Sequence, residues 1–250
     1  MKLNKLCYCA VPKAFGINLI SHDKSLPLQC IQFEGLTGLR TFFIVFLFSL
    51  CFISCKSQTS EPTLAETTML PYFNGADFTP EWNTPKHKIP EFSFVNQNGE
   101  TINNNTFKGK IYIADFFFTS CPGICPKLTT NMKTLQDTFE KDADILLLSH
   151  TVMPWRDSIP VLKKYAEKYD VNSSKWHLVT GDKDELYNIA RTGYFADEDF
   201  TKTQDESNFI HTENFILVDK KGHIRGVYNG TLPVDIERLK RHVEILKREI

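Results

Sequence analysis

The chain has 250 residues, of which 42% are apolar, 12% aromatic and 24% charged, as in an ordinary globular protein. Twelve glycines and twelve prolines are too few for a collagen-like or low-complexity chain. The net charge of -1 lacks the basic surplus that neutralises phosphates, so we expect no nucleic-acid partner.

The first element along the chain is an apolar stretch that ends just before Cys55. Residues 42–54 are a run of 13, which fits the roughly 7–15 residues of a signal-peptide core and is short of the ~18 of a membrane span. Ser54 before Cys55 resembles the lipobox of bacterial lipoproteins, although Phe52 stands where leucine is commoner. We therefore expect residues 1–54 to be a leader that is cleaved, and Cys55 to be lipidated. The alternatives are an uncleaved anchor or a buried strand.

Residues 1–40 are long for the charged part of a leader. No methionine lies between Met1 and Met69, and a non-ATG start at Leu36 or Leu39 would give a leader of normal shape. We therefore hypothesise that the start is over-extended. Detection of peptides from residues 1–35 in the precursor would contradict this.

The number and the positions of the cysteines limit the reactions that the protein can carry out. The seven cysteines are residues 7, 9, 30, 51, 55, 121 and 125. Cleavage before Cys55 removes four of them and lipidation uses the fifth, which leaves Cys121 and Cys125. A lone pair of thiols in an oxidising compartment forms a disulfide, binds a metal, or does both.

The next segment is a linker, followed by the start of a folded domain. Residues 56–84 are rich in Ser, Thr, Pro and Glu, and we interpret residues 55–87 as a lipid-anchored, flexible tether. Apolar and polar residues then alternate over residues 91–102 on both sides of Asn98-Gly99, which predicts a hairpin. The apolar run 111–118 predicts a strand that is buried on both faces.

Helices and strands then alternate to the end of the chain. The spacing of apolar residues predicts helices over 126–141, 159–169, 183–195 and 234–250, strands over 143–150 and 176–181, and a second hairpin over 214–230. This order predicts one α/β domain over residues 88–250, with a central mixed sheet flanked by helices and an N-terminal hairpin. The arrangement is thioredoxin-like.

The residues that carry chemistry follow the first buried strand. Cys121-Pro-Gly-Ile-Cys125-Pro126 lies between that strand and a helix, at the carboxyl edge of the predicted sheet, where functional sites are common. Unpaired N–H groups and the dipole of the helix favour thiolates there. Three residues separate the cysteines instead of the usual two, which is compatible with a disulfide and with one ion held between both sulfurs.

Two thiolates alone specify a metal site weakly, so we expect a third ligand. His211 directly precedes the second hairpin, which in a thioredoxin-like fold starts beside the cysteine loop, and we predict that it binds the metal. His150 ends the second buried strand and is therefore a candidate neighbour at the same edge. His177 and His223 have no such position, and we expect ordinary structural roles for them.

The motifs T-S-C-P-G-I-C-P at residues 119–126 and I-H-T at residues 210–212 resemble those of the Sco/SenC family. Members of that family are thioredoxin-like copper proteins that serve the assembly of cytochrome c oxidase. The resemblance covers about residues 88–250 and implies one copper ion, Cu(I) or Cu(II), bound by Cys121, Cys125 and His211. It also implies a copper-bearing oxidase subunit as partner, a thiol reductant or copper carrier as a second partner, and a lipid-anchored domain that faces the periplasm.

The chain departs from the family in one loop. The family often carries V-D-P-x-R-D after the second buried strand, whereas this chain has Val152-Met-Pro-Trp-Arg-Asp157. Pro154, Arg156 and Asp157 match, but Met153 replaces the first acidic residue. Met153 is either a fourth soft ligand or an ordinary loop residue.

The donor set leaves both the metal and the function open. Two thiolates and an imidazole suit Cu(I), or Cu(II) with an added oxygen, and zinc accepts the same set, so that only the family favours copper.

We prefer a copper metallochaperone without turnover. A thiol-disulfide oxidoreductase that reduces the cysteines of partner proteins is the alternative, and a peroxidase is a third. The lack of proline between Pro160 and Pro233 counts against a general oxidoreductase, which uses a cis-proline there. The prolines beside the paired cysteines do not resemble a peroxidase site.

Overall fold

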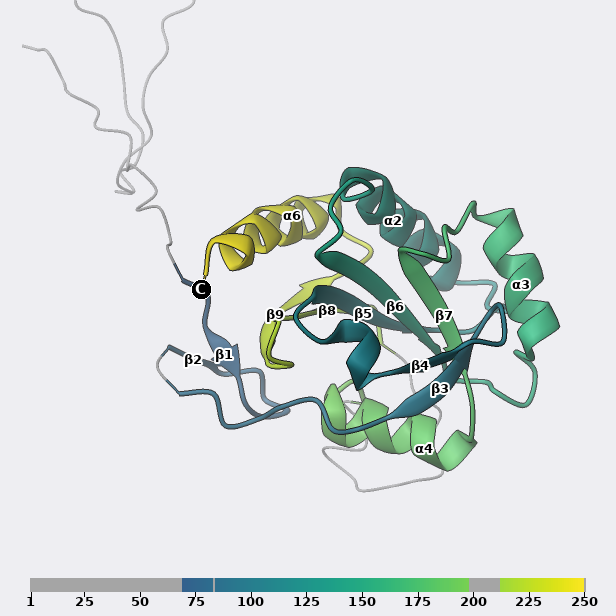
Figure 1. The fold of residues 1–250 in the computed structure, drawn as a ribbon, viewed down its shortest axis with the longest axis horizontal. Coiled ribbons are helices and arrows are strands. Elements are labelled where there is room, and N and C mark those ends of the chain that lie inside the picture. The colour runs from purple at the N-terminus through teal and green to yellow at the C-terminus, as the bar shows by residue number, and fades with distance from the viewer. Residues whose placement is uncertain (1–68, 83, 198–211, 250) are drawn as a thin grey trace, which may run out of the picture. The chain divides into compact units, whose positions relative to one another are not determined.

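A seven-stranded mixed sheet forms the centre of the fold in the computed structural model, which describes residues 69–82, 84–197 and 212–249 (Figure 1). The strand order is β4-β3-β7-β6-β5-β8-β9. β5, β6 and β7 are parallel, and the strands that flank them pair antiparallel. The bounds of the strands are β3 Ser93–Asn96, β4 Thr101–Asn103, β5 Ile111–Phe117, β6 Ile145–Thr151, β7 Trp176–Thr180, β8 Asn214–Val218 and β9 Ile224–Asn229.

Helices cover both faces of this sheet. α2 (Cys125–Thr138) and α6 (Pro233–Arg248) lie on one face and α4 (Lys183–Asn188) on the other (Figure 1). The buried side of α3 (Ile159–Lys168) joins the same core cluster as α2 and α6. Every residue of β5 is buried, and its side chains alternate between the two layers, which explains why its sequence is apolar except at Asp115.

The predicted elements agree with this architecture, and the thioredoxin-like α/β fold is confirmed. The two hairpins turn at Gly99 and Gly222, which have φ values of 80° and 89° that favour glycine. One helix differs from its prediction. The segment 183–195 is α-helical only to Asn188 and continues as a π-turn over Ile189–Gly193, after which Tyr194 is fully buried and its hydroxyl meets that of Tyr112.

The predicted tether is wrong in its last part, because residues from 69 onward belong to the folded domain. β1 (Tyr72–Phe73) pairs antiparallel with β2 (Pro80–Glu81). Leu70 is 1% exposed, and the guanidinium of Arg225 donates to the carbonyl oxygens of Leu70 and Pro71 at 2.5 and 3.0 Å. The composition changes at this point, because Leu70, Tyr72, Phe73, Phe78 and Trp82 follow a polar stretch without aromatic residues, and this change was a usable signal.

The leader and the lipidation prediction fall on residues 1–55, outside the described residues. Among the helices that the structure describes, none combines the length and the apolar character needed to cross a membrane.

Candidate metal centre

The two thiols lie where β5 gives way to α2, as the motif predicts. Cys125 is the first residue of α2 and is 4% exposed, whereas Cys121 lies in the preceding loop and is partly exposed. Both are free thiols. One sulfur is therefore accessible from solvent, and the other is covered by the core.

The sulfur of Cys121 occupies the position of an N-terminal helix cap. Ile124, the N-cap residue of α2, makes no side-chain capping bond. Partial burial would raise the pKa of the Cys121 thiol, but the backbone N–H groups of residues 123–125 and the thiol of Cys125 donate to its sulfur, and together they lower this pKa below its usual value. Cys121 is thus the thiol that ionises first.

The surroundings of Cys125 shift the pKa of its thiol in the opposite direction. Burial raises the pKa of its thiol to about 12, and the hydrogen bond to Cys121 and the negative charges of Cys121 and Asp115 act in the same direction. A hydrogen bond from the backbone of Phe118 opposes them only in part. The first proton that the pair loses therefore comes from Cys121, and the second is held much more tightly.

A buried carboxyl group lies on β5 near the cysteines. Asp115 is 2% exposed, accepts a hydrogen bond from the hydroxyl of Ser149, and has its pKa raised to about 7 by burial. Ser149 in turn accepts from the indole N–H of Trp176 at 2.8 Å. Asp115 is not among the predicted site residues, although a single charged residue in an otherwise apolar strand is a usable signal.

A second buried carboxylate holds the loop that leads into the motif. Asp157 is 0% exposed and accepts hydrogen bonds from the backbone N–H of Thr119 at 3.2 Å, from the hydroxyl of Thr119, and from the hydroxyl of Thr151. Because Thr151 ends β6, these bonds fasten the residues before Cys121 to the neighbouring strand. Asp157 is therefore a positioning residue for the cysteine loop.

The comparisons with known proteins agree with this geometry. The family model described as SCO1/SenC matches residues 81–246, about two thirds of the chain. The chain belongs to the SCO1/SenC family. The family membership predicted from the motifs at residues 119–126 and 210–212 is thereby confirmed.

Individual relatives of this SCO1/SenC chain cover most of the folded domain. The SCO1 protein homolog of Bacillus subtilis is 32% identical over 149 residues, which are 58% of this chain and 75% of that protein. A protein of Stutzerimonas stutzeri that is named for copper binding is 30% identical over 59% of this chain and 72% of its own. The solved structure of BsSco, described as a member of the Sco family of cytochrome c oxidase assembly proteins with a disulfide switch, has a TM-score of 0.57 and 26% identity, and the match covers 67% of this chain and 98% of that one.

His150 of this SCO1/SenC chain lies on the other face of the sheet from the cysteines. It pairs with Phe116 across β5 and β6, stacks on that ring at 5.1 Å, and packs with Phe92, Phe94 and Tyr194 in the core under α4. It is fully buried, neither ring nitrogen has a partner among the described residues, and burial lowers its pKa to about 3. The residue is at the predicted edge, but its side chain is in the wrong layer to join the thiols.

Met153 packs against the same core cluster as His150, whereas both cysteines belong to the cluster under α2. Its backbone N–H donates to Thr151, and its carbonyl oxygen accepts from the N–H groups of Arg156 and Asp157. These contacts are those of a turn residue, and they favour the structural interpretation of Met153.

His211 lies outside the described residues. Within the described ranges, no three His, Cys, Asp or Glu side chains are grouped so that they could hold a metal ion by themselves. β8 begins at Asn214 and runs antiparallel to β5, so its first residue lies near the carboxyl end of β5, the edge that carries the cysteines. The ligand role of His211 stays a prediction.

Apolar side chains are exposed around the cysteine edge. Ile124 of the motif is 44% exposed, Trp155 of the β6–α3 loop 56%, and Leu232 and Val234 beside the start of α6 are 46% and 69% exposed. Asp157 ties the first two loops together, and a 2.6 Å hydrogen bond from Asn131 to the carbonyl oxygen of Gly230 holds the third against α2. Exposed apolar patches of this kind mark surfaces that bind other proteins.

Replacing Asp157 with asparagine is expected to loosen the cysteine loop. The change weakens charge-assisted hydrogen bonds in a fully buried position, so we expect a loss of about 2–3 kcal/mol in the free energy of unfolding and faster hydrogen exchange at residues 118–121. Asp182→Asn is the matched control, because it alters an exposed N-cap of α4. Equal exchange at residues 118–121 in both variants would show that Asp157 does not position the loop.

Proposed function

We propose that this SCO1/SenC chain is a copper-binding protein of the cell envelope that supports the assembly of cytochrome c oxidase. It holds one copper ion through Cys121, Cys125 and His211 and delivers it to a copper-bearing oxidase subunit. The observation that carries the proposal is the pair of adjacent thiols at the start of α2, one of them partly exposed and with a lowered pKa. The copper-binding relative and the oxidase-assembly relative support it.

The donor set fits copper. Thiolate and imidazole are soft to intermediate ligands, which suit Cu(I). Because its pKa is lowered, Cys121 offers a thiolate more readily than Cys125, which has a pKa of about 12 and must release a proton when the ion binds. Oxidation of the two thiols to a disulfide removes two protons and two electrons and destroys the site, so loading is confined to the reduced protein.

The surroundings of the site suit a transient partner. Ile124, between the two cysteines, offers apolar contact area beside the sulfurs, and Trp155 exposes a large apolar side chain on the neighbouring β6–α3 loop. Transfer of an ion between two proteins requires that donor and acceptor ligands meet, and an exposed Cys121 with an apolar surround meets that need. The lipid at Cys55, which we also propose, keeps the domain at the membrane on the periplasmic side.

The test is an anaerobic Cu(I) competition titration of the reduced protein and of its His211→Ala variant. We expect one tightly bound copper per chain and a clear loss of affinity in the variant, with formation of the disulfide unchanged. His87→Gln is the control imidazole, since His87 bonds to the carbonyl oxygen of Gly193 away from the cysteines. Equal affinity of the His211 variant and the wild type removes His211 from the site.

One observation favours a thiol-disulfide oxidoreductase as the second candidate. An exposed thiol of lowered pKa next to a buried thiol of raised pKa is the arrangement of a nucleophile and a resolving cysteine. In the same titration, no tight copper binding but rapid reduction of a test disulfide would select this function over the first.

A further inference from the structure

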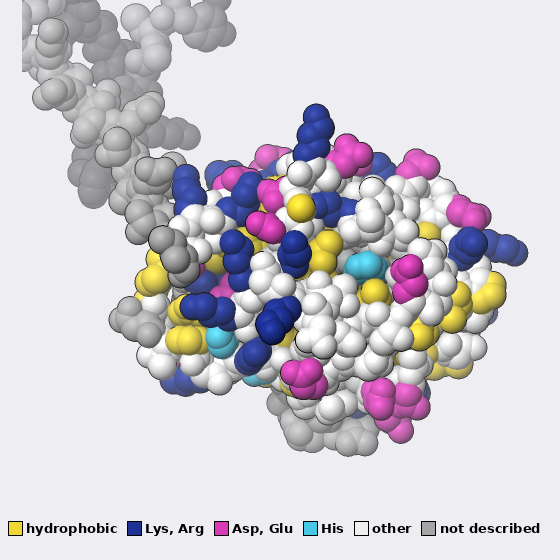
Figure 2. All heavy atoms as spheres, in the orientation of Figure 1, with side chains coloured by type: hydrophobic (Ala, Val, Ile, Leu, Met, Phe, Trp, Pro, Cys, Tyr) yellow, Lys and Arg dark blue, Asp and Glu magenta, His cyan; other side chains and the backbone are white. Residues whose placement is uncertain are grey.

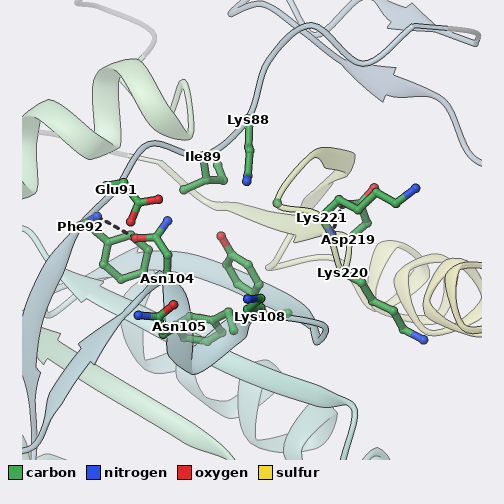
Figure 3. Close-up of a pocket in the computed structure, with 13 residues that line it drawn as sticks. Lys88, Ile89, Glu91, Phe92, Asn104, Asn105, Lys108, Asp219, Lys220 and Lys221 are labelled. Carbon is green, nitrogen blue, oxygen red and sulfur yellow. Dashed lines mark hydrogen bonds between the residues drawn. The ribbon is translucent and has the colours of Figure 1, made fainter.

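A lysine-rich pocket lies at the edge of the sheet opposite the cysteines. It has a volume of about 400 Å³, and its floor includes Ile89, Phe107 and Tyr112. Lys88, Lys108, Lys220 and Lys221 line it (Figure 3), and we call these four residues the lysine pocket. Tyr112 is near the start of β5 and the cysteines follow its end, so the seven residues of the strand, about 20 Å, separate the two sites.

The backbone fixes the lysines relative to one another. The N–H of Ile89 donates to the carbonyl oxygen of Gly222 at 2.9 Å, which holds the segment with Lys88 against the β8–β9 turn. The stem of Lys88 passes over that turn so closely that a Cβ on Gly222 would lie 3.1 Å from its Cε. Figure 3 shows Lys88 pointing into the pocket, while Lys220 and Lys221 extend away from it on one side.

The positive charge of this pocket is not neutralised from within. All four lysines are exposed, and none of them forms an ion pair within the described part of the chain. Two acidic residues line the pocket, but Asp219 pairs with Arg225 at 3.2 Å, which leaves Glu91 as the opposing charge. The site therefore favours an anion, and ammonium groups around an apolar floor suit a phosphate that carries an apolar body.

The pocket is also next to the place where the described chain begins. Arg225, which pairs with Asp219 of the pocket, holds the carbonyl oxygens of Leu70 and Pro71. Tyr72 lines a smaller neighbouring pocket together with Lys220 and Lys221. In Figure 2, Lys and Arg side chains gather on the left part of the face, where β1 and β9 lie in Figure 1.

We propose that the lysine pocket binds the phosphate groups of anionic phospholipids, so that the domain rests on its membrane with the cysteine edge turned away. The proposal rests on the attachment at Cys55 that we propose above. Thirteen residues, 56–68, separate Cys55 from Met69, and they span at most about 45 Å. The side of the domain where the chain arrives is therefore held within reach of the lipid surface, and this is the side that carries the lysines.

Lysine labelling of the full, lipidated chain tests the proposal. The protein is placed in nanodiscs of phosphatidylcholine alone or with phosphatidylglycerol, and each lysine is quantified by mass spectrometry after brief treatment with an amine-specific reagent. We expect several-fold slower labelling of Lys88, Lys108, Lys220 and Lys221 in the anionic discs only, and recovery at high salt. Lys163 and Lys164 on α3 are the internal reference, because they are exposed and unpaired within the described ranges.

Two exposed pairs provide matched variants. Lys220→Gln with Lys221→Gln is expected to return the labelling of Lys88 toward its value in neutral discs, since each lysine near an anionic leaflet changes binding about five-fold. Lys163→Gln with Lys164→Gln is expected to leave it unchanged. Both pairs are exposed, and an unaltered copper titration shows that neither double variant disturbs the fold or the metal site.

Each other outcome has a defined meaning. Equal labelling of the four lysines in both kinds of disc overturns the proposal. Equally strong protection by inorganic phosphate in detergent assigns the pocket to a soluble phosphate compound and overturns the membrane assignment. Protection that depends on protein concentration in neutral discs assigns it to a second copy of the chain. A chain that does not enter the discs contradicts the attachment at Cys55, and this proposal with it, without affecting the copper result.

Discussion

Cys121→Ser and Cys125→Ser are each expected to abolish tight copper binding, but to leave single thiols of very different reactivity. Each change removes one of two sulfur ligands, so we expect the affinity for Cu(I) to fall by more than the 10–100-fold typical of residues that only support a ligand. The remaining thiols differ because the fold treats them differently. The backbone N–H groups at the start of α2 stabilise the thiolate of Cys121, whereas burial raises the pKa of Cys125 to about 12.

Alkylation at neutral pH measures this difference. We expect Cys121 in the Cys125→Ser variant to react more than about 1,000-fold faster than Cys125 in the Cys121→Ser variant, from thiolate population and exposure together. The control is the same reaction in denaturant, where the two thiols should react alike because the fold is gone. Similar rates in the native variants would contradict the assignment of Cys121 as the ionised thiol.

Asp115→Asn is expected to remove a fall in the free energy of unfolding between about pH 4 and pH 7, which in the wild type is opposed by buried His150, whose lowered pKa of about 3 makes stability rise with pH. Burial raises the folded-state pKa of Asp115 to about 7, above the ordinary value of 3.8. Between these values the folded state binds more protons than the unfolded state, so the free energy of unfolding falls as the pH rises. The shift corresponds to a loss on the order of 4 kcal/mol, fully present only above the folded pKa.

Asparagine is the suitable replacement because its oxygen still accepts the hydrogen bond from Ser149. Urea unfolding of the reduced wild type and variant at a series of pH values is the measurement. We expect the free energy of unfolding of the variant, relative to that of the wild type, to increase from acidic to neutral pH, because the contribution of His150 is common to both proteins. Asp182→Asn, an exposed helix cap, should reproduce the wild-type slope. Parallel curves for Asp115→Asn and the wild type would show that Asp115 is ionised in the folded state throughout.

The cysteine pair and its position could be predicted because local patterns determine them. An apolar strand followed by a helix that begins with proline places the thiols at the sheet edge whatever the rest of the chain does. Asp157 could not be identified as the residue that fastens this loop, because its partners Thr119 and Thr151 come from two other segments and meet it only in the folded chain.

The layer occupied by His150 was equally inaccessible to sequence reasoning. In a strand buried on both faces, such as β6, both sets of alternating side chains are buried, so the sequence does not show which face of the sheet each one occupies. The sheet edge at which His150 lies is therefore predictable, but the face on which its side chain lies is not. The start of the domain, in contrast, was open to prediction, because aromatic residues such as Tyr72 and Phe73 follow the polar linker. The contacts of Leu70 and Arg225 that fix this segment form only in the folded chain.

The sulfur that caps α2 makes the first turn of that helix dependent on the chemical state of the thiol. If copper or a disulfide bond forms at Cys121 as we propose, it would compete with the N–H groups of residues 123–125 for the electrons of that sulfur, and we expect the geometry around Ile124 to change. Ile124 belongs to the exposed apolar surround of the site. A partner that contacts this surround would then discriminate between loaded and empty protein, and by linkage it would change the affinity for copper by the same factor.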